Sequence, residues 1–298
     1  MSARDRSGER ARKGHRQVKI ARFFHNGQER CGVVDGESIS EVDWGLRDAL
    51  VLAASGHDEL VDTGLGTTYD TASVSLLAPL VNGSRMFCIG INYPEHQRES
   101  ADVFSGDIPS HPIVFMKTAT AIAAPGTELL LDHAVSREYD WEAELGVLIG
   151  APANAIDRDN AWDVVAGYTL VNDITARDLQ VAHVQWFLGK NSQGSTPIGP
   201  WVVTRGEMGT HPDVNIRLTV NGITKQDGQT GEMIFDIPTL ISTISTVTPL
   251  LPGDIIATGT PSGVGFKRTP PEFLTDGDEV EVAVTGVGTL RNRISTGL

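Results

Sequence analysis

The strongest structural signal in the chain is EYDWEAELGVLIG, residues 138–150, whose side chains alternate in polarity as they do on a β-strand. One face of this strand is apolar and typical of a core, and it carries Tyr139, Trp141, Ala143, Leu145 and Val147. The opposite face carries Asp140, Glu142, Glu144 and Gly146. The sequence therefore predicts a strand that lies between a core and a group of acids.

Glu142 and Glu144 lie side by side on the second face. Adjacent carboxylates repel each other, and the arrangement is costly unless a cation lies between them or the face is solvated. For a glutamate pair in general, a solvated outer face is the commoner explanation. Here the following LGVLIG is strongly apolar, which indicates a central strand and favours a metal site.

A third carboxylate, Asp173, comes where the apolar strand VVAGYTLV, residues 164–171, stops. Taken alone, with Thr175 and Asp178 close behind it, Asp173 is better explained as a cap at a helix start. Together with Glu142 and Glu144 it completes an oxygen-only set. Such a set suits Mg²⁺, Mn²⁺ or Ca²⁺ rather than Zn²⁺, and leaves about three of about six Mg²⁺ positions for water or substrate.

A histidine and a glutamate form a second candidate group. Strand MFCIGI, residues 86–91, ends before Pro94, which suits the start of a short helix. His96 and Glu99 are three residues apart on that helix and can touch. A histidine oriented by a carboxylate is a common general base, although a surface helix pair explains the spacing equally well. The groups that suit an anionic substrate are Lys117, Arg177, Gln180 and Lys190.

The rest of the chain alternates short apolar runs with turn signals. Asn26-Gly27 and Asn221-Gly222 predict hairpins, and helices are expected near residues 43–56, 176–187 and 238–247. Residues 57–75 are expected to form a loop or linker. There is no regular βαβ alternation, so we expect a β-rich α+β fold. The glycine-rich residues 259–265 match no nucleotide-binding motif and predict a tight loop that presents N–H groups to an anion.

Composition and charge restrict the partners. The 298 residues are 40% hydrophobic with a formal net charge of −14, which divides into +6 over residues 1–22 and −20 over the remainder. An acidic body argues against nucleic acid as a partner. The basic residues 1–17 are expected to be a disordered leader, a nucleic-acid or membrane arm being the alternative. No apolar run approaches the ~18 residues of a membrane span. Two cysteines, Cys31 and Cys88, fit a reducing cytoplasm.

The order of motifs resembles the fumarylacetoacetate hydrolase superfamily. The matching segments run from about residue 85 to the C-terminus and are residues 90–99, 115–117, 140–145, 172–180, 189–190, 197–200, 221–228 and 252–265. The resemblance implies a mixed β-roll over residues 81–298 and a small β-rich N-terminal domain over residues 18–80. Two segments depart from the family pattern. Asn191-Ser192-Gln193 replaces the frequent Ser-Phe-Asp, and Thr118 replaces a frequent proline.

The resemblance also implies a homodimer and roles for single residues. It implies Mg²⁺ or Mn²⁺, with Ca²⁺ as a substitute in a crystal, held by Glu142, Glu144 and Asp173. It makes His96 and Glu99 a catalytic pair on a lid, with Lys190 as a third catalytic group. The substrate contacts that it implies are Lys117, Arg177, Gln180, Gln226 and Thr260.

The implied substrates are small anionic 2-oxo acids and 2-enol diacids of aromatic catabolism. A metal and Lys190 would stabilise the enolate that forms when a proton moves or a C–C bond breaks. Isomerisation or decarboxylation of 2-hydroxyhepta-2,4-diene-1,7-dioate and hydrolysis of acylpyruvates both fit this chemistry. Oxaloacetate decarboxylation and a catalytically silent metal-binding homologue are the alternatives. The absence of phosphate-binding loops argues against a nucleotide-linked enzyme.

Overall fold

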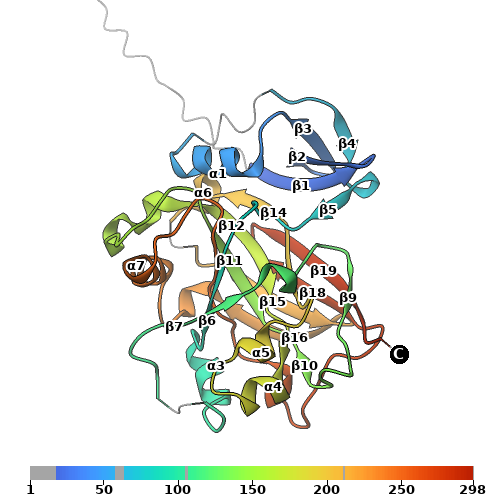
Figure 1. Cartoon of the computed structure of the whole chain (residues 1–298), viewed down its shortest axis with the longest axis vertical. Coiled ribbons are helices and arrows are strands. Elements are labelled where there is room, and N and C mark those ends of the chain that lie inside the picture. The colour runs from blue at the N-terminus through green and yellow to red at the C-terminus, as the bar shows by residue number, and fades with distance from the viewer. Residues whose placement is uncertain (1–17, 58–63, 105–106, 211, 298) are drawn as a thin grey trace, which may run out of the picture.

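The computed structural model describes residues 18–57, 64–104, 107–210 and 212–297, so the predicted leader, residues 1–17, lies outside the described residues. Strands dominate these residues and form one large mixed sheet, a five-stranded sheet and a two-stranded ladder (Figure 1). The prediction of a β-rich α+β fold is confirmed.

The N-terminal part is a small meander covered by one helix. The predicted hairpin at Asn26-Gly27 is confirmed, since both residues have positive φ (48° and 81°) as its turn requires. The elements are β1 (Lys19–His25), β2 (Gln28–Asp35), β3 (Ser38–Val42), α1 (Leu46–Ala54) and β4 (Thr68–Asp70). Strand β4 lies inside the predicted linker and pairs with β3. Its Tyr69 packs against Phe23 of β1, with ring centroids 5.5 Å apart. The expectation of a loop or linker over residues 57–75 is wrong for β4 and for Ser75, where β5 (Ser75–Leu77) begins, and its residues 58–63 lie outside the described residues.

The large sheet runs on from this meander, because β1 pairs with β14. Its further order is β14 (Thr196–Thr204), β12 (Val165–Asn172), β11 (Ala143–Ile149), β17 (Ile255–Ala257), β6 (Met86–Gly90) and β7 (Ile113–Lys117). Two short strands join at the side, β5 (Ser75–Leu77) on β1 and β8 (Ile122–Ala123) on β14. The boundary expected near residue 80 stays a prediction.

The second sheet packs against the centre of the first. Its order is β16 (Ile223–Gln229), β15 (Asn215–Val220), β18 (Glu279–Val284), β19 (Gly288–Ser295) and β9 (Glu128–Leu130). Strands β11, β12 and β14 contact its members β15, β18 and β19. The apolar face predicted for residues 138–150 is buried in the core between the sheets, together with α7 (Ile237–Val247). Leu240, Ile241 and Ile244 of α7 are buried, whereas Val247 at its end is 86% exposed.

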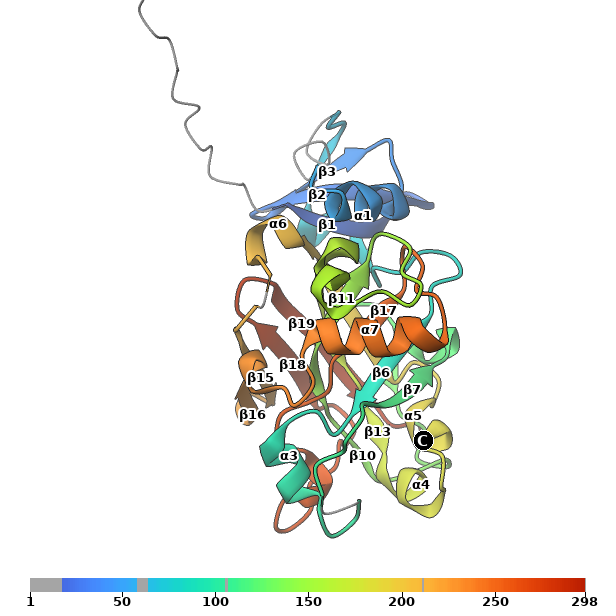
Figure 2. The ribbon, with the colours of Figure 1, turned by 90° about the vertical axis from the view of Figure 1, so that its left-hand side faces the viewer.

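The remaining helices are short. They are α3 (Pro94–Glu99), α4 (Arg177–Ala182), α5 (Phe187–Lys190) and α6 (Arg205–Met208), with 3₁₀ turns at Thr71–Ser73, Ala119–Ala121, Arg158–Val164, Thr230–Glu232 and Gly265–Lys267. Helices α3, α4 and α5 lie at the end of the molecule opposite the N-terminal meander (Figures 1 and 2). None of the helices in the described ranges is long and apolar enough to cross a membrane.

The expected helix over residues 176–187 is wrong, because His183 is extended (φ −121°, ψ 142°) and divides it into α4 and α5. The two helices then pack closely: a Cβ on Gly189 would lie 2.6 Å from the backbone nitrogen of Gln180. The absence of a side chain at Gly189 allows this contact.

Candidate metal centre and active site

Three buried carboxylates meet where β11 and β12 pair. Glu144 lies on β11, Glu142 is the residue directly before β11, and Asp173 is the residue directly after β12. The Asp173 backbone N–H donates to the Glu142 carbonyl at 2.8 Å, which continues the ladder to these two residues. One carboxylate oxygen from each residue lies within 4.8 Å of the others, and all three side chains are buried. The structure therefore brings the predicted ligand set together.

Two lysines lie against this triad. Lys190 ends α5, and its Nζ donates to Glu142 Oε2 at 2.6 Å and to Asp173 Oδ2 at 2.8 Å. Lys117 ends β7 and forms an ion pair with Asp173. Asp173 is therefore bound by ammonium groups and does not cap α4, whose N-cap is Ala176.

Thr118 and Asn191, which follow these lysines, contact each other: the Thr118 N–H donates to Asn191 Oδ1 at 2.6 Å. A proline at 118 has no N–H to give. The two departures from the family pattern thus belong to one contact, and it joins the ends of β7 and α5 that carry Lys117 and Lys190.

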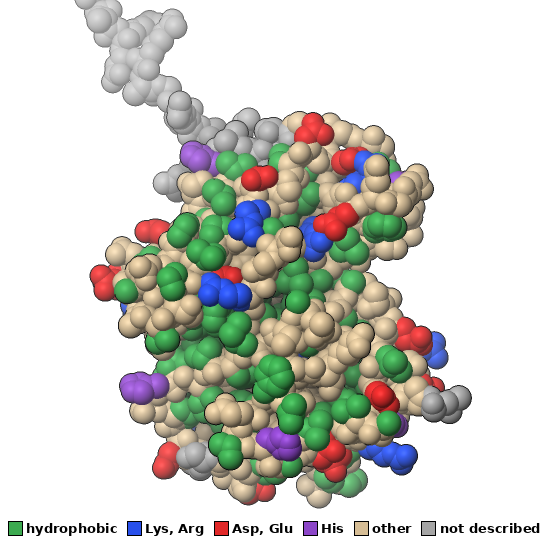
Figure 3. Space-filling model, viewed as in Figure 1, with side chains coloured by type: hydrophobic (Ala, Val, Ile, Leu, Met, Phe, Trp, Pro, Cys, Tyr) green, Lys and Arg blue, Asp and Glu red, His purple; other side chains and the backbone are tan. Residues whose placement is uncertain are grey.

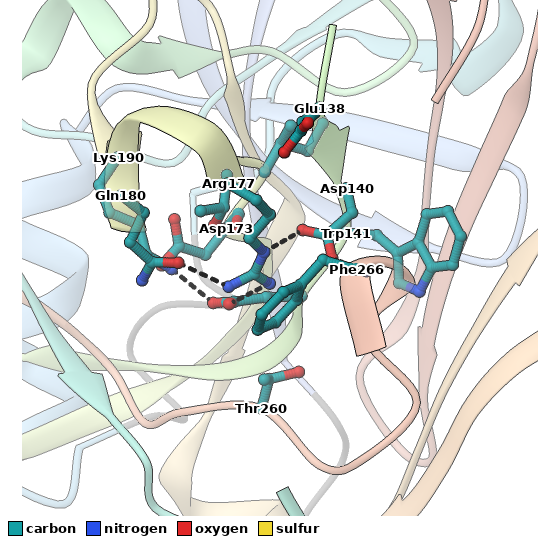
Figure 4. Close-up of polar contacts among 12 residues, drawn as sticks. Glu138, Asp140, Trp141, Asp173, Arg177, Gln180, Lys190, Thr260 and Phe266 are labelled. Carbon is teal, nitrogen blue, oxygen red and sulfur yellow. Dashed lines mark hydrogen bonds and ion pairs between the residues drawn. The ribbon is translucent and has the colours of Figure 1, made fainter. Parts of the chain in front are cut away.

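Arg177 holds Glu142 on the carboxylate oxygen that Lys190 leaves free, and Figure 4 shows it between Asp140 and Gln180. Its Nη2 donates to Glu142 Oε1 at 2.6 Å, its Nε to Asp140 Oδ1 at 2.6 Å and its Nη1 to Gln180 Oε1 at 2.9 Å. The Phe266 ring lies 4.3 Å from the guanidinium carbon. Asp140 was placed on this strand face by the alternation, but its ion pair was not predicted. No local signal pointed to Arg177 as its partner, because the ion pair depends on the pairing of residues 139–140 with residues 175–176.

The pKa values follow from burial and from these neighbours. Burial raises the pKa of Glu142, but Lys190, Arg177 and His96 lower it by more, to about 2. Burial, with Asp173 and Glu142 as like-charged neighbours, raises the pKa of Glu144 well above its usual value. Burial also raises the pKa of Asp140 to about 6, against the opposing effect of Arg177. Glu144 is thus the carboxylate with the least compensation by positive charge.

The charge of the cluster fits a bound dication. Its four carboxylates are Asp140, Glu142, Glu144 and Asp173, and its three cations are Lys117, Arg177 and Lys190, so the seven side chains sum to −1. A divalent cation would change this sum to +1, which suits an anionic substrate. The donor atoms are carboxylate oxygens, the ligands that Mg²⁺ and Mn²⁺ prefer. Glu142, Glu144 and Asp173 are the residues that would hold the ion.

The predicted contact between His96 and Glu99 is present on α3. His96 Nδ1 lies 2.7 Å from Glu99 Oε1, and His96 is only 5% exposed, so an ordinary surface pair is excluded. Asn92 fixes the segment before α3, because its Nδ2 donates to the Thr258 carbonyl at 2.7 Å. With Nδ1 facing Glu99, Nε2 is the nitrogen that can exchange a proton with another group.

The glycine-rich loop after β17 presents its N–H groups to anions, as predicted, and these anions are carboxylates of the chain itself. Gly259 donates to Glu144 Oε2 at 3.0 Å, and Gly263 donates to Glu99 Oε2 at 3.0 Å. Gln226 holds this loop to β11: its Oε1 accepts from Ala143 N at 2.9 Å, and its Nε2 donates to Thr260 Oγ1 at 2.7 Å. In this structure Gln226 and Thr260 act as braces, and their substrate contacts stay predictions.

The buried acid triad with its two lysines lies in a mixed β-roll, where strands β11 and β12 position the acids. The chain belongs to the fumarylacetoacetate (FAA) hydrolase family, whose C-terminal family model matches residues 85–295. The resemblance seen in the motifs is thereby confirmed, and the protein is an enzyme of this superfamily.

Several characterised relatives are similar in sequence. The oxaloacetate tautomerase YisK of Bacillus subtilis is 42% identical over 76% of this chain and 75% of its own length. A 2,4-didehydro-3-deoxy-L-rhamnonate hydrolase of a Sphingomonas species is 36% identical over 93% of this chain and 96% of its own.

Solved structures share the fold. The 2-hydroxyhepta-2,4-diene-1,7-dioate isomerase of Mycobacterium marinum has a TM-score of 0.76 at 30% identity and covers 94% of this chain and 98% of its own. The fumarylacetoacetate hydrolase of Exiguobacterium antarcticum has a TM-score of 0.80 at 33% identity, covering 94% of this chain and 100% of its own. These relatives include tautomerases, isomerases and hydrolases.

Proposed function

We propose that this protein is a Mg²⁺- or Mn²⁺-dependent enzyme that isomerises small 2-enol or 2-oxo diacids by moving a proton between oxygen and carbon. The observation that carries the proposal is the oriented His96–Glu99 pair, which one loop joins to the buried site: Gly263 N–H binds Glu99 and Gly259 N–H binds Glu144. The site itself combines three carboxylates with Lys190. Relatives named as tautomerase and isomerase support this class of reaction.

The bound ion would act as a Lewis acid that lowers the cost of negative charge on the C2 oxygen of the substrate. Lys190 stays protonated, because Asp173 and Glu142 hold its pKa above the ordinary value despite burial. It therefore offers a fixed positive charge to the same oxygen. His96 Nε2 exchanges the proton, and Glu99 stabilises the imidazolium that forms.

Hydrolytic C–C cleavage of acylpyruvates is the second candidate. The same His96–Glu99 pair can activate water, and the rhamnonate-pathway relative named as a hydrolase matches 93% of this chain. In both reactions negative charge develops on the C2 oxygen. They differ in the group that exchanges a proton with His96, which is the substrate in isomerisation and water in hydrolysis.

We also propose a homodimer that forms through an apolar surface on α4, α5 and β7. Its side chains are between 40% and 96% exposed and are Val114, Met116, Val181, Val184, Phe187 and Leu188. Residues 179–189 contain no Asp, Glu, Lys or Arg, so this neutral face avoids the repulsion between two chains of net charge −14. On the face shown in Figure 3, which includes α4 and α5, exposed apolar side chains are interspersed with charged ones.

A substrate panel tests the proposed reaction. Oxaloacetate enol, an acylpyruvate and a 2-hydroxy-dienedioate are each followed by the loss of the enol ultraviolet band, with Mg²⁺, with Mn²⁺ and with a chelator. Faster enol loss without pyruvate supports isomerisation, and pyruvate from an acylpyruvate supports hydrolysis. Glu144→Gln should remove metal-dependent turnover, while the surface substitution Glu281→Gln should not. A protein that binds Mn²⁺ yet turns over none of the three substrates would refute the proposal.

A further inference from the structure

We infer that Asp140 is a positioning residue that acts through Arg177 to fix the direction in which Glu142 presents its carboxylate to the metal. The inference rests on the proposed metal-dependent function and adds to it a residue outside the ligand set.

Asp140 is fully buried and joins three segments of the chain. It lies on β10 (Tyr139–Asp140), which pairs with β13 (Thr175–Ala176), the two residues before Arg177. Its Oδ1 accepts from Arg177 Nε at 2.6 Å, and its Oδ2 accepts from Phe266 N at 2.9 Å. Both carboxylate oxygens thus have a fixed donor, and neither donor belongs to a metal ligand.

Arg177 transmits this position to Glu142. A guanidinium is a rigid planar fork, so the carboxylates at its Nε and at its Nη2 are held in a fixed mutual arrangement. Gln180 occupies Nη1, and the Phe266 ring covers the guanidinium at 4.3 Å, which leaves Arg177 little freedom to turn (Figure 4). Glu142 Oε1 therefore faces Arg177, and Oε2 faces Lys190 at 2.6 Å.

The charge of Asp140 also matters. In Asp140→Asn the amide Oδ1 would still accept from Arg177 Nε, but the guanidinium charge would be paired with Glu142 alone. Glu142 would then be attracted more strongly to Arg177 and would be a weaker ligand for a cation. Partners that orient metal ligands in this way typically contribute 10–100-fold to metal affinity.

An ordinary buried ion pair is the competing explanation, and the chain offers a matched control. Asp254 is also buried, pairs with Arg85, and accepts backbone N–H bonds from Arg85 at 3.0 Å and from Leu251 at 2.8 Å. None of these partners is a residue of the site. Loss of the Asp254 carboxylate should therefore lower stability and leave metal affinity unchanged.

The test compares full-length wild type, Asp140→Asn and Asp254→Asn, with the metal alone as probe. Free Mn²⁺ is measured by electron paramagnetic resonance during titration, and folding is checked by circular dichroism and thermal unfolding. We expect the Mn²⁺ dissociation constant to rise about 10–100-fold in Asp140→Asn and to change less than about 2-fold in Asp254→Asn, although both lower the unfolding temperature.

Wild-type affinity in Asp140→Asn would refute the positioning role alone. A wild-type protein without Mn²⁺ affinity would refute the proposed function, and this inference with it. If Asp140→Asn does not fold, Asp140→Glu keeps the charge but displaces the Arg177 fork. In that variant a Mn²⁺ affinity equal to wild type would also overturn the inference.

Discussion

Replacing His96 with alanine should slow turnover by about 10²–10⁴-fold, the usual contribution of a positioned general base. At about 1.4 kcal/mol for each factor of ten, this corresponds to about 3–5.5 kcal/mol of barrier. The structure supports a full effect, because His96 is buried and held at 2.7 Å from Glu99. The metal affinity should change little, because His96 is not among the three carboxylate ligands.

Glu99→Gln should cost less than His96→Ala. It keeps the imidazole but removes a charge-assisted hydrogen bond worth about 1.5–3 kcal/mol, which corresponds to about 10–150-fold in rate. The amide also weakens the contact with the Gly263 N–H, which the carboxylate now accepts at 3.0 Å. The expected order of turnover is therefore wild type, then Glu99→Gln, then His96→Ala.

The assay is steady-state kinetics on an enolisable 2-oxo diacid and on an acylpyruvate, with Mn²⁺ titrations of each variant. If the protein is an isomerase, His96→Ala should cost less on the diacid than on the acylpyruvate, because the metal and Lys190 supply most of the stabilisation. Glu95→Gln is the matched control, since Glu95 pairs with Arg98 on the exposed side of the same helix. Wild-type turnover by His96→Ala on both substrates would refute the role of His96.

Other predictions concern the ligands, the N-terminus and the dimer. Glu142→Ala and Asp173→Ala should abolish Mg²⁺ binding in calorimetry while the fold survives, and undiminished affinity would remove the substituted residue from the site. Stability of Glu142→Ala without metal should fall, because the substitution removes a buried carboxylate partner from both Lys190 and Arg177. Deleting residues 1–16 should leave turnover and oligomeric state unchanged, because the segment has too little apolar surface to offset the entropy of ordering, and a large loss of turnover would contradict this. Phe187→Asp should convert a dimer to a monomer in light scattering, and a dimer that persists would place the interface elsewhere.

Much of the fold could be predicted because its signals are local. The alternation in residues 138–150 identified the central strand β11, but the predicted single strand is wrong at its start, where β10 is separate and pairs with β13. The Asn-Gly pairs identified two hairpins, since a turn with positive φ at both residues favours these residue types. The ligand triad was also accessible. Glu142 and Glu144 were placed on one strand face by the alternation. Asp173 follows β12, which is the neighbour of β11 in the sheet.

The contacts that could not be predicted join segments that are distant in sequence. The ion pair between Asp140 and Arg177 depends on the pairing of β10 with β13, which the local pattern does not encode. The break at His183 lets Gly189 pack against Gln180, a contact between two helices that the local sequence does not indicate. Strand β4 forms in a polar stretch whose local sequence predicts a loop. Its Tyr69 packs against Phe23 of β1, so tertiary packing overrides the local preference for a loop.

The loop that carries Gly259 and Gly263 limits how the enzyme can be redesigned. Each of these residues has a φ near +100° and close backbone or side-chain neighbours, so a side chain at either position is strained. A substitution there would disturb both Glu144, a proposed metal ligand, and the His96–Glu99 pair, because this one short segment binds Glu144 and Glu99. The contact between Thr118 and Asn191 also lies beside two site residues, Lys117 and Lys190, but Thr118 (φ −79°) and Asn191 (φ −129°) have backbone conformations that other residues adopt without strain. Directed evolution of new substrate preferences should therefore begin with libraries at these two positions and leave the loop unchanged.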